Sequence, residues 1–145
     1  LATDYPQAAP DGTSPRLCIS LPESSERAQS FLSANDAGFR IWPGLKAVPG
    51  WRGAALSYRR IFRELRDKTV PEALIVEDDV VLPADFDNSL TTIRAAMDRS
   101  GADMFSGLIV DLHKDARVLN VERCEGLVLV HLDRAVMMIC NLYRT

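Results

Sequence analysis

Hydrophobic positions follow two different spacings along the chain, and these spacings predict an α/β fold. Short, nearly continuous apolar runs predict buried strands, whereas apolar residues repeated every three or four positions predict helices. Strands are predicted at residues 16–21, 39–48, 73–76, 103–112, 117–121 and 127–132, and helices within 22–39 and at 53–67, 84–99 and 133–143. Because strands alternate with helices over most of the chain, we expect a central sheet flanked by helices.

The strand at residues 74–76 is apolar at every position, which predicts burial on both faces. Such strands are typical of parallel sheets, so we expect it inside a mostly parallel sheet, with the helices at 53–67 and 84–99 packed on its faces. In the helix at 53–67, the apolar side is expected to contain Ala54, Ala55, Tyr58, Ile61, Phe62 and Leu65. The solvated side of the same helix is expected to contain Arg59, Arg63 and Arg66.

The composition fits a soluble globular protein. The chain has 145 residues, of which 47% are hydrophobic and 26% charged, and its formal net charge is −3. This balance argues against a nucleic-acid-binding surface, and no stretch reaches the ~18 apolar residues of a transmembrane helix. Residues 1–15 contain three prolines and no hydrophobic period, which predicts a flexible leader before a single domain at 16–145.

The three cysteines, Cys18, Cys124 and Cys140, are widely spaced and odd in number. This pattern favours reduced thiols over a disulfide framework or a zinc site, and it favours a reducing compartment.

Three consecutive carboxylates interrupt the apolar run "ALIVEDDVVL" at residues 73–82. Carboxylates crowded near a buried strand raise one another's pKa unless a cation or hydrogen-bond donors compensate. Because side chains alternate along a strand, Glu77 and Asp79 are expected to point together and Asp78 away from them, unless the strand has already turned there. The pair predicts a site for a hard divalent cation that keeps further positions for phosphate oxygens and water. The alternative is an acidic turn that caps the next helix or meets arginines.

The string "LIVEDD" resembles the end of the first strand of response-regulator receiver domains. A receiver needs a phosphoacceptor aspartate at the end of its third strand, two β-α units later. Asp111 follows after only one helix, and the rest of the chain is too short to complete that fold. The resemblance to receivers therefore stops at the motif.

A longer resemblance is to glycosyltransferase family 25, the lipopolysaccharide-biosynthesis and collagen-glycosyltransferase group. Three blocks are similar to the family's blocks and occur in the same order: "CISLPESSER" at 18–27, "GWRGAALSYRRIF" at 50–62 and "PEALIVEDDVVLPADF" at 71–86. The resemblance implies a GT-A-like, Rossmann-type domain. It also implies a transferase that moves a sugar, with galactose as one candidate, from a nucleoside-diphosphate donor to a glycan or lipopolysaccharide acceptor.

The same resemblance implies particular roles for residues of this chain. Asp79, together with Glu77, would bind Mn²⁺ or Mg²⁺ on the donor diphosphate, and the metal would stabilise the leaving nucleoside diphosphate. The residues implied to bind the donor are Ser20, Leu21, Arg27, Ser57, Glu77 and Asp78. Tyr58 departs from the family, which has histidine at this position, so a family role that needs an imidazole is in doubt.

An inverting transferase also needs a base that deprotonates the acceptor hydroxyl. Asp111, His113 and Asp115 are the candidates; Asp111 is taken as catalytic together with Asp79, although the sequence does not choose among the three. Family members are usually longer than this chain. An alternative is therefore a domain that is incomplete at its C-terminal end. The competing hypothesis is a truncated or degenerate transferase with a binding or structural role. A cytoplasmic location is implied, either free or peripheral to the inner membrane.

Overall fold

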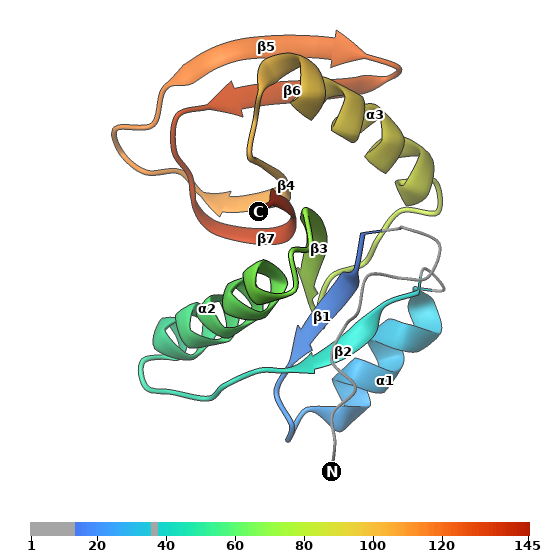
Figure 1. Ribbon diagram of the computed structural model, residues 1–145, viewed down its shortest axis with the longest axis vertical. Helices are drawn as coiled ribbons and strands as arrows, with labels where there is room; N and C mark the ends of the chain where they lie inside the picture. Colours follow the sequence, from blue (N-terminus) through green and yellow to red (C-terminus); the bar gives the residue numbers. More distant parts are fainter. Residues whose placement is uncertain (1–13, 36–37) are drawn as a thin grey trace.

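The computed structural model describes residues 14–35 and 38–145. In chain order, its elements are β1 (Arg16–Ser20), α1 (Ser25–Ala34), β2 (Arg40–Pro43), α2 (Gly50–Asp67), β3 (Glu72–Glu77), α3 (Phe86–Ser100), β4 (Met104–Asp111), β5 (Val118–Cys124), β6 (Leu127–Leu132) and β7 (Val136–Arg144). They form a five-stranded sheet flanked by helices and a separate two-stranded hairpin (Figure 1). The predicted α/β class is confirmed. None of the described helices is long and apolar enough to cross a membrane.

The five-stranded sheet is mixed, and the prediction of a mostly parallel sheet was wrong. Its order is β2-β1-β3-β7-β4. Strands β2, β1 and β3 are parallel to one another, whereas β7 runs antiparallel to both of its neighbours, β3 and β4. The strand at 74–76 still lies inside the sheet, as predicted, because β1 and β7 flank it.

The C-terminal segment forms the strand β7, so the helix predicted at 133–143 was also wrong. Asn141 and Leu142 are almost completely buried, and β7 pairs with β3 on one side and β4 on the other. An apolar run of this length fits either a buried helix or a buried strand by its local pattern. The long-range pairing decides the outcome, because β7 satisfies the backbone groups of both neighbouring strands.

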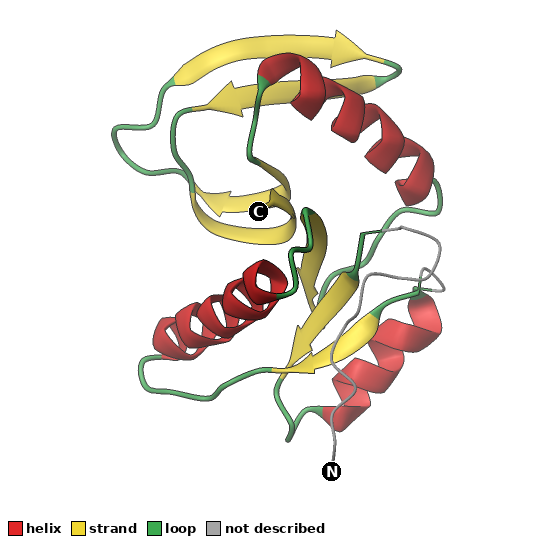
Figure 2. Ribbon diagram, in the orientation of Figure 1, coloured by secondary structure: helices red, strands yellow, loops and turns green. Residues whose placement is uncertain are grey.

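Helices cover both faces of the sheet, as expected (Figure 2). On β3, Leu74 and Val76 point into a core shared with α1 and α3, where Phe31, Leu90 and Ile93 are buried. Ala73 and Ile75 point to the opposite face, where they meet Ile61 and Leu65 of α2. The sheet is therefore the middle of three layers, with its parallel strands ending at one edge.

The buried side of α2 differs from the predicted one at its beginning. The buried positions of α2 follow each other every four residues: Gly53, Ser57, Ile61 and Leu65. Ala54 and Ala55 are exposed instead. The reason is the close approach of the loop before α2, since a Cβ at Gly53 would lie 2.2 Å from the carbonyl oxygen of Leu45.

The hairpin of β5 and β6 confirms the two strands predicted at 117–121 and 127–132, although β5 continues to Cys124. Leu127 and Leu129 pack against the core, and two polar contacts join the hairpin to α3, from Arg99 to Glu122 and from Thr92 to Glu125. The hairpin thus depends on α3 for its position.

Most of the predicted leader lies outside the described residues. Its last two residues are bonded to β3: the Ser14 hydroxyl donates to Glu72 at 2.6 Å, and the Pro15 carbonyl accepts from the Leu74 N–H at 3.0 Å. These two residues therefore continue the contacts that β1 makes with β3.

Candidate functional site

The three consecutive acidic residues lie where β3 ends, at the carboxyl edge of the parallel strands. Glu77 is the last residue of β3 and lies opposite Ile19 of β1. A turn follows, in which the Val80 N–H donates to the Glu77 carbonyl. The loops after β1 and β2 leave the same edge, because these strands are parallel to β3. Ligands of open α/β sheets bind at such an edge.

Asp78 is used inside the protein. Its side chain is only 5% exposed, accepts a hydrogen bond of 2.5 Å from the Ser20 hydroxyl and lies 3.3 Å from the Arg27 guanidinium. Asp78 therefore connects β3 to the end of β1 and to α1. The sequence predicted a donor-binding role for Asp78, Ser20 and Arg27, and the structure brings Ser20 and Arg27 into contact with Asp78.

Glu77 and Asp79 differ from Asp78, because neither carboxylate has a hydrogen bond or an ion pair within residues 14–35 and 38–145. Glu77 is half-buried and Asp79 is exposed. The pKa of Glu77 is raised, first by burial and then by the charges of Asp79 and Asp78, while Arg27 opposes the rise. A cation bound at these carboxylates would remove the mutual repulsion.

Cys18 lies beside the acidic residues but is a poor ligand. It is completely buried, and burial together with the charges of Asp78, Asp79 and Glu77 raises the pKa of its thiol to about 12. Cys18 is therefore protonated at neutral pH. Among the described residues, no three His, Cys, Asp or Glu side chains come together in a group able to hold a metal ion. A cation here would need oxygen ligands from a substrate or water.

Ser57, a predicted donor-binding residue, is 1% exposed. Its hydroxyl donates to the Gly53 carbonyl at 2.8 Å and accepts from the Leu45 N–H at 2.8 Å. Both contacts are to backbone groups, so Ser57 holds the loop at residues 44–49 against the start of α2. Its geometry therefore fits a role in positioning this loop and not a direct contact with a ligand.

Tyr58 packs on the sheet side of α2. Its ring meets those of Phe62 and Tyr143, each with a centroid distance of 6.1 Å. Burial raises the pKa of its hydroxyl, and the nearby Tyr143 and Glu77 raise it further. Tyr58 therefore remains neutral near Glu77 and does not replace a titrating histidine.

The loops after β1 and β2 border the acidic residues. Leu21, a predicted donor-binding residue, is half-buried, and its carbonyl accepts from the Ser24 N–H at 2.8 Å. The Gly44 N–H donates to the Ser20 carbonyl at 2.8 Å, and Lys46 forms an ion pair of 2.7 Å with Glu23. These contacts fix the two loops side by side next to Asp78.

Asp111 does not join this group. It is exposed at the end of β4, where it pairs with Val136 of β7. Because β7 lies between β3 and β4, two strand spacings, about 10 Å, separate Asp111 from the strand that carries the acidic residues. His113 and Asp115 lie further along the same loop, with 3.7 Å between His113 Nδ1 and Asp115 Oδ2. The structure thus assembles the donor-side residues and leaves the predicted base apart from them.

No protein-family model matches this chain, and no curated protein matches its sequence. The resemblance to glycosyltransferase family 25 therefore stays a prediction.

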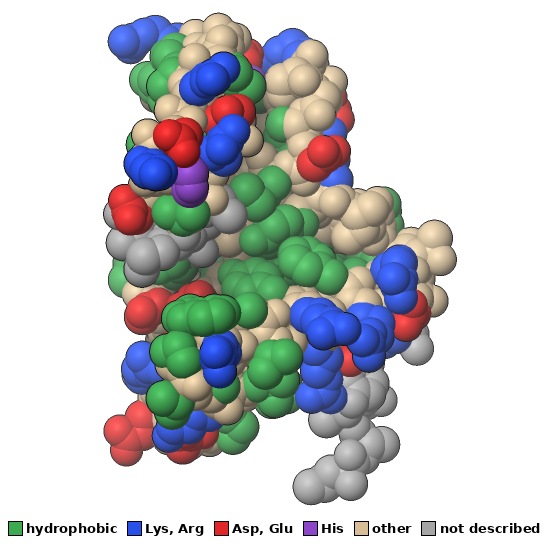
Figure 3. All heavy atoms as spheres, turned by 90° about the vertical axis from the view of Figure 1, so that its left-hand side faces the viewer, with side chains coloured by type: hydrophobic (Ala, Val, Ile, Leu, Met, Phe, Trp, Pro, Cys, Tyr) green, Lys and Arg blue, Asp and Glu red, His purple; other side chains and the backbone are tan. Residues whose placement is uncertain are grey.

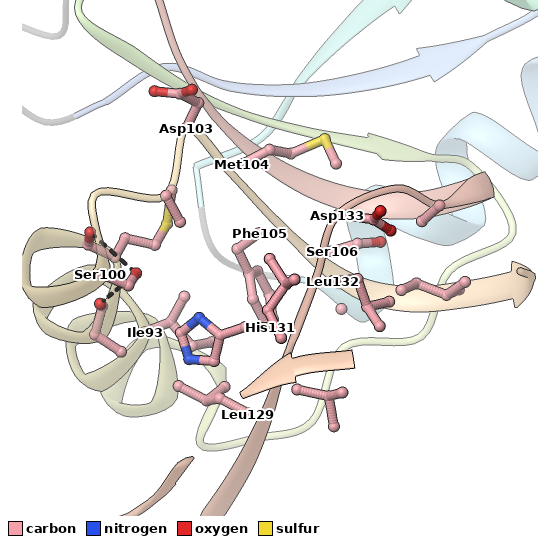
Figure 4. A pocket seen from close by; sticks show the side chains of 18 of the residues that line it. Ile93, Ser100, Asp103, Met104, Phe105, Ser106, Leu129, His131, Leu132 and Asp133 are labelled. Carbon is pink, nitrogen blue, oxygen red and sulfur yellow. Dashed lines mark hydrogen bonds between the residues drawn. The ribbon is translucent and has the colours of Figure 1, made fainter. Parts of the chain in front are cut away.

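A separate cavity of about 690 Å³ lies between α3, β4 and the hairpin (Figure 4). Its lining is mostly apolar and includes Ile93, Phe105, Leu129 and His131, but none of the predicted site residues. The Nε2 atom of His131 is buried without a hydrogen bond in the described part of the chain, 3.6 Å from a Glu122 oxygen. No sequence signal marks this cavity, because its walls come from elements whose proximity only the fold defines.

Proposed function

We propose that the protein binds a nucleoside-diphosphate sugar at the carboxyl edge of its parallel strands and transfers the sugar to a glycan acceptor, as a metal-dependent transferase of GT-A type. The observation that carries the proposal is that the three acidic residues have different environments. Asp78 is neutralised internally, whereas Glu77 and Asp79 have no partner in the described part of the chain. Unneutralised adjacent carboxylates at a ligand-binding edge favour a cation there.

Asp79 and Glu77 would hold Mn²⁺ or Mg²⁺. Both ions prefer oxygen ligands, and Mg²⁺ is usually bound by one or two carboxylates together with substrate phosphates. Among the described residues no third His, Cys, Asp or Glu completes such a group, so the remaining ligands would have to come from the substrate and water. When bound, the metal would act as a Lewis acid that stabilises the departing diphosphate.

The loops after β1 and β2 are placed to border the donor. Arg27 is 55% exposed although it contacts Asp78, so its guanidinium can also reach a phosphate at the surface. A side chain at Gly44 would lie 3.1 Å from Ile19 and 3.3 Å from the Ser20 carbonyl, so the backbone there approaches β1 closely. The hydrogen bonds of Ser57 to the backbone of Leu45 and Gly53 hold this loop against the start of α2.

A donor-binding module without transfer activity is the second candidate. It is favoured by the position of Asp111, which lies two strand spacings away from β3 and leaves the donor edge without an adjacent base among the described residues. Hydrolysis or transfer of the sugar separates the two candidates, because a module binds the donor and does not turn it over.

Calorimetric titration of a nucleoside diphosphate, with manganese or with chelator, tests the proposal. Affinity of the wild type should depend on manganese, and Asp79→Asn should remove most of that dependence, because the anionic ligand is lost. Asp103→Asn is the matched control, since Asp103 is exposed and precedes β4 at the opposite edge of the sheet. If the wild type and Asp79→Asn bind with equal affinity, both in manganese and in chelator, the proposal of a metal site at Asp79 is contradicted.

A further inference from the structure

An exposed apolar surface lies at the beginning of α2. We call it the apolar tip; its residues and their exposed fractions are Leu45 (38%), Val48 (88%), Trp51 (67%) and Leu56 (45%). The tip is held rigidly, because the Leu45 N–H donates to Ser57 and the backbone of Gly53 packs against the Leu45 carbonyl. Four large apolar side chains are therefore presented to solvent by a fixed loop and the first two turns of a helix.

A row of arginines continues from the tip along the outward side of α2. Arg52, Arg59 and Arg63 follow each other at intervals of seven and four residues, opposite the buried positions of the helix. We call them the arginine stripe. Arg59 and Arg63 have no ion pair within the described residues, and Arg52 lies 5.5 Å from the Trp51 ring centroid.

This helix is more basic than the chain as a whole. α2 contains five arginines and two acidic residues, while the whole chain carries a net charge of −3. The face shown in Figure 3 includes the start of α2, with hydrophobic side chains open to solvent and Lys and Arg side chains beside them. The sequence pattern alone fitted a solvated helix face; the exposure of the apolar tip changes that interpretation.

We propose that the apolar tip and the arginine stripe dock on an anionic lipid bilayer. The apolar face of α2 packs on the sheet, so only the apolar tip can enter the boundary between headgroups and acyl chains, as exposed apolar side chains do when basic residues lie beside them. Tryptophan favours this depth, and arginines close to anionic headgroups add electrostatic attraction. Trp51 and Val48 insert, while Arg59 and Arg63 contact the headgroups.

Two other occupants fit the surface less well. A second copy of the chain would form a two-fold contact, which presents the same patch on both sides and opposes one arginine stripe to the other. A nucleic acid would attract the arginines but would leave the apolar tip in water. The bilayer is the partner that satisfies both parts of the surface. The proposal does not depend on the transferase function.

The two tryptophans allow a direct test, since Trp42 is 4% exposed and Trp51 is 67% exposed. Protein is mixed with vesicles of phosphatidylcholine alone or with phosphatidylglycerol added, and Trp emission and co-sedimentation are measured. A blue shift and sedimentation are expected with the anionic vesicles only, and both should weaken as salt increases. Absence of binding to anionic vesicles at low salt overturns the proposal.

Matched variants identify the surface. Trp51→Ser and Val48→Ser should each weaken sedimentation, and Arg59→Ala with Arg63→Ala should weaken it roughly tenfold or more. Val121→Ser and Arg123→Ala, at exposed positions on β5, should bind like the wild type. Circular dichroism confirms that each variant is folded. Equal losses in the β5 variants, or an equal blue shift with soluble heparin, would assign the attraction elsewhere and overturn the proposal.

Discussion

Three neighbouring acidic residues have three different environments. Asp78 is buried against Ser20 and Arg27, Glu77 is half-buried near Tyr58, and Asp79 is exposed in the turn. Because β3 ends at Glu77, Asp78 and Asp79 lie in the following turn, and only Asp78 is in contact with Ser20 and Arg27. At the scale of single residues, the candidate site therefore consists of one internally paired acid and two acids with unrelieved charge.

Glu77 should make stability depend on pH in an unusual direction for an acid. Its folded pKa is raised by burial and by Asp79 and Asp78, so the native state binds the Glu77 proton more tightly than the unfolded chain does. This contribution favours folding at pH values below the unfolded pKa, and it is lost as pH rises through the folded pKa. Ionisation of Glu77 is therefore less favourable in the native state than in the unfolded chain.

Glu77→Gln should raise the free energy of unfolding at neutral pH, and the advantage over wild type should shrink at acidic pH, where Glu77 is protonated in both states. Urea unfolding of both proteins at several pH values measures this. A variant less stable than wild type at neutral pH would show that the Glu77 carboxylate has a stabilising partner.

At the scale of elements, α2 connects the loop after β2 to the sheet. Gly53 allows the close contact with Leu45, and Ser57 adds the hydrogen bond to the same residue. This explains why the buried side of the helix starts at Gly53 and not at Ala54 and Ala55. It also means that both proposed surfaces, the donor edge and the apolar tip, share one loop whose position is set by two residues.

Gly53→Ala should destabilise the protein although alanine favours helices. Its Cβ would lie 2.2 Å from the Leu45 carbonyl oxygen, and overpacking of this kind costs about 1–3 kcal/mol. Gly50→Ala is the matched control, because nothing lies within 4 Å of a Cβ there and the helix propensity gain should be neutral or stabilising. Urea unfolding compares the two. Similar stabilisation by both changes would show that the loop does not press on Gly53.

At the scale of the whole molecule, β3 and β7 form the centre of the five-stranded sheet, whereas the hairpin lies at one end of the molecule (Figure 1). Residues Ala73 to Val76 are completely buried, and Asn141 and Leu142 nearly so. In the hairpin, Val118, Leu119 and Val121 are more than half exposed, at 61%, 65% and 53%. Local stability should therefore differ strongly between the two regions.

Hydrogen exchange should be slowest in the amides of β3 and the β3-paired part of β7, and much faster in β5 and β6. Arg99→Ala should accelerate exchange in the hairpin without changing that of β3, because it removes the contact between Arg99 and Glu122. Mass spectrometry of peptides after exchange resolves these segments. Hairpin protection equal to that of β3 would contradict this distribution of stability.

The sequence by itself determined the element types wherever the pattern was local. The apolar run around Leu74 predicted a buried interior strand, the spacing of Ile61 and Leu65 predicted α2, and the acids after β3 were placed correctly at a strand end. Burial and helical periodicity act over a few residues, so one segment contains the information. The donor-binding roles, the bound metal and the transferase activity remain predictions.

Only the tertiary structure decided which distant segments pair and which of their side chains are in contact. The run at 136–144 became a strand because β3 and β4 both pair with it, which also made the sheet mixed. Asp78 differs from Glu77 and Asp79 because Ser20 and Arg27, which are distant from it in the sequence, contact its carboxylate. The apolar tip is exposed because Gly53 and Ser57 fix its loop in place. These outcomes depend on contacts between residues far apart in the chain, which no local pattern contains.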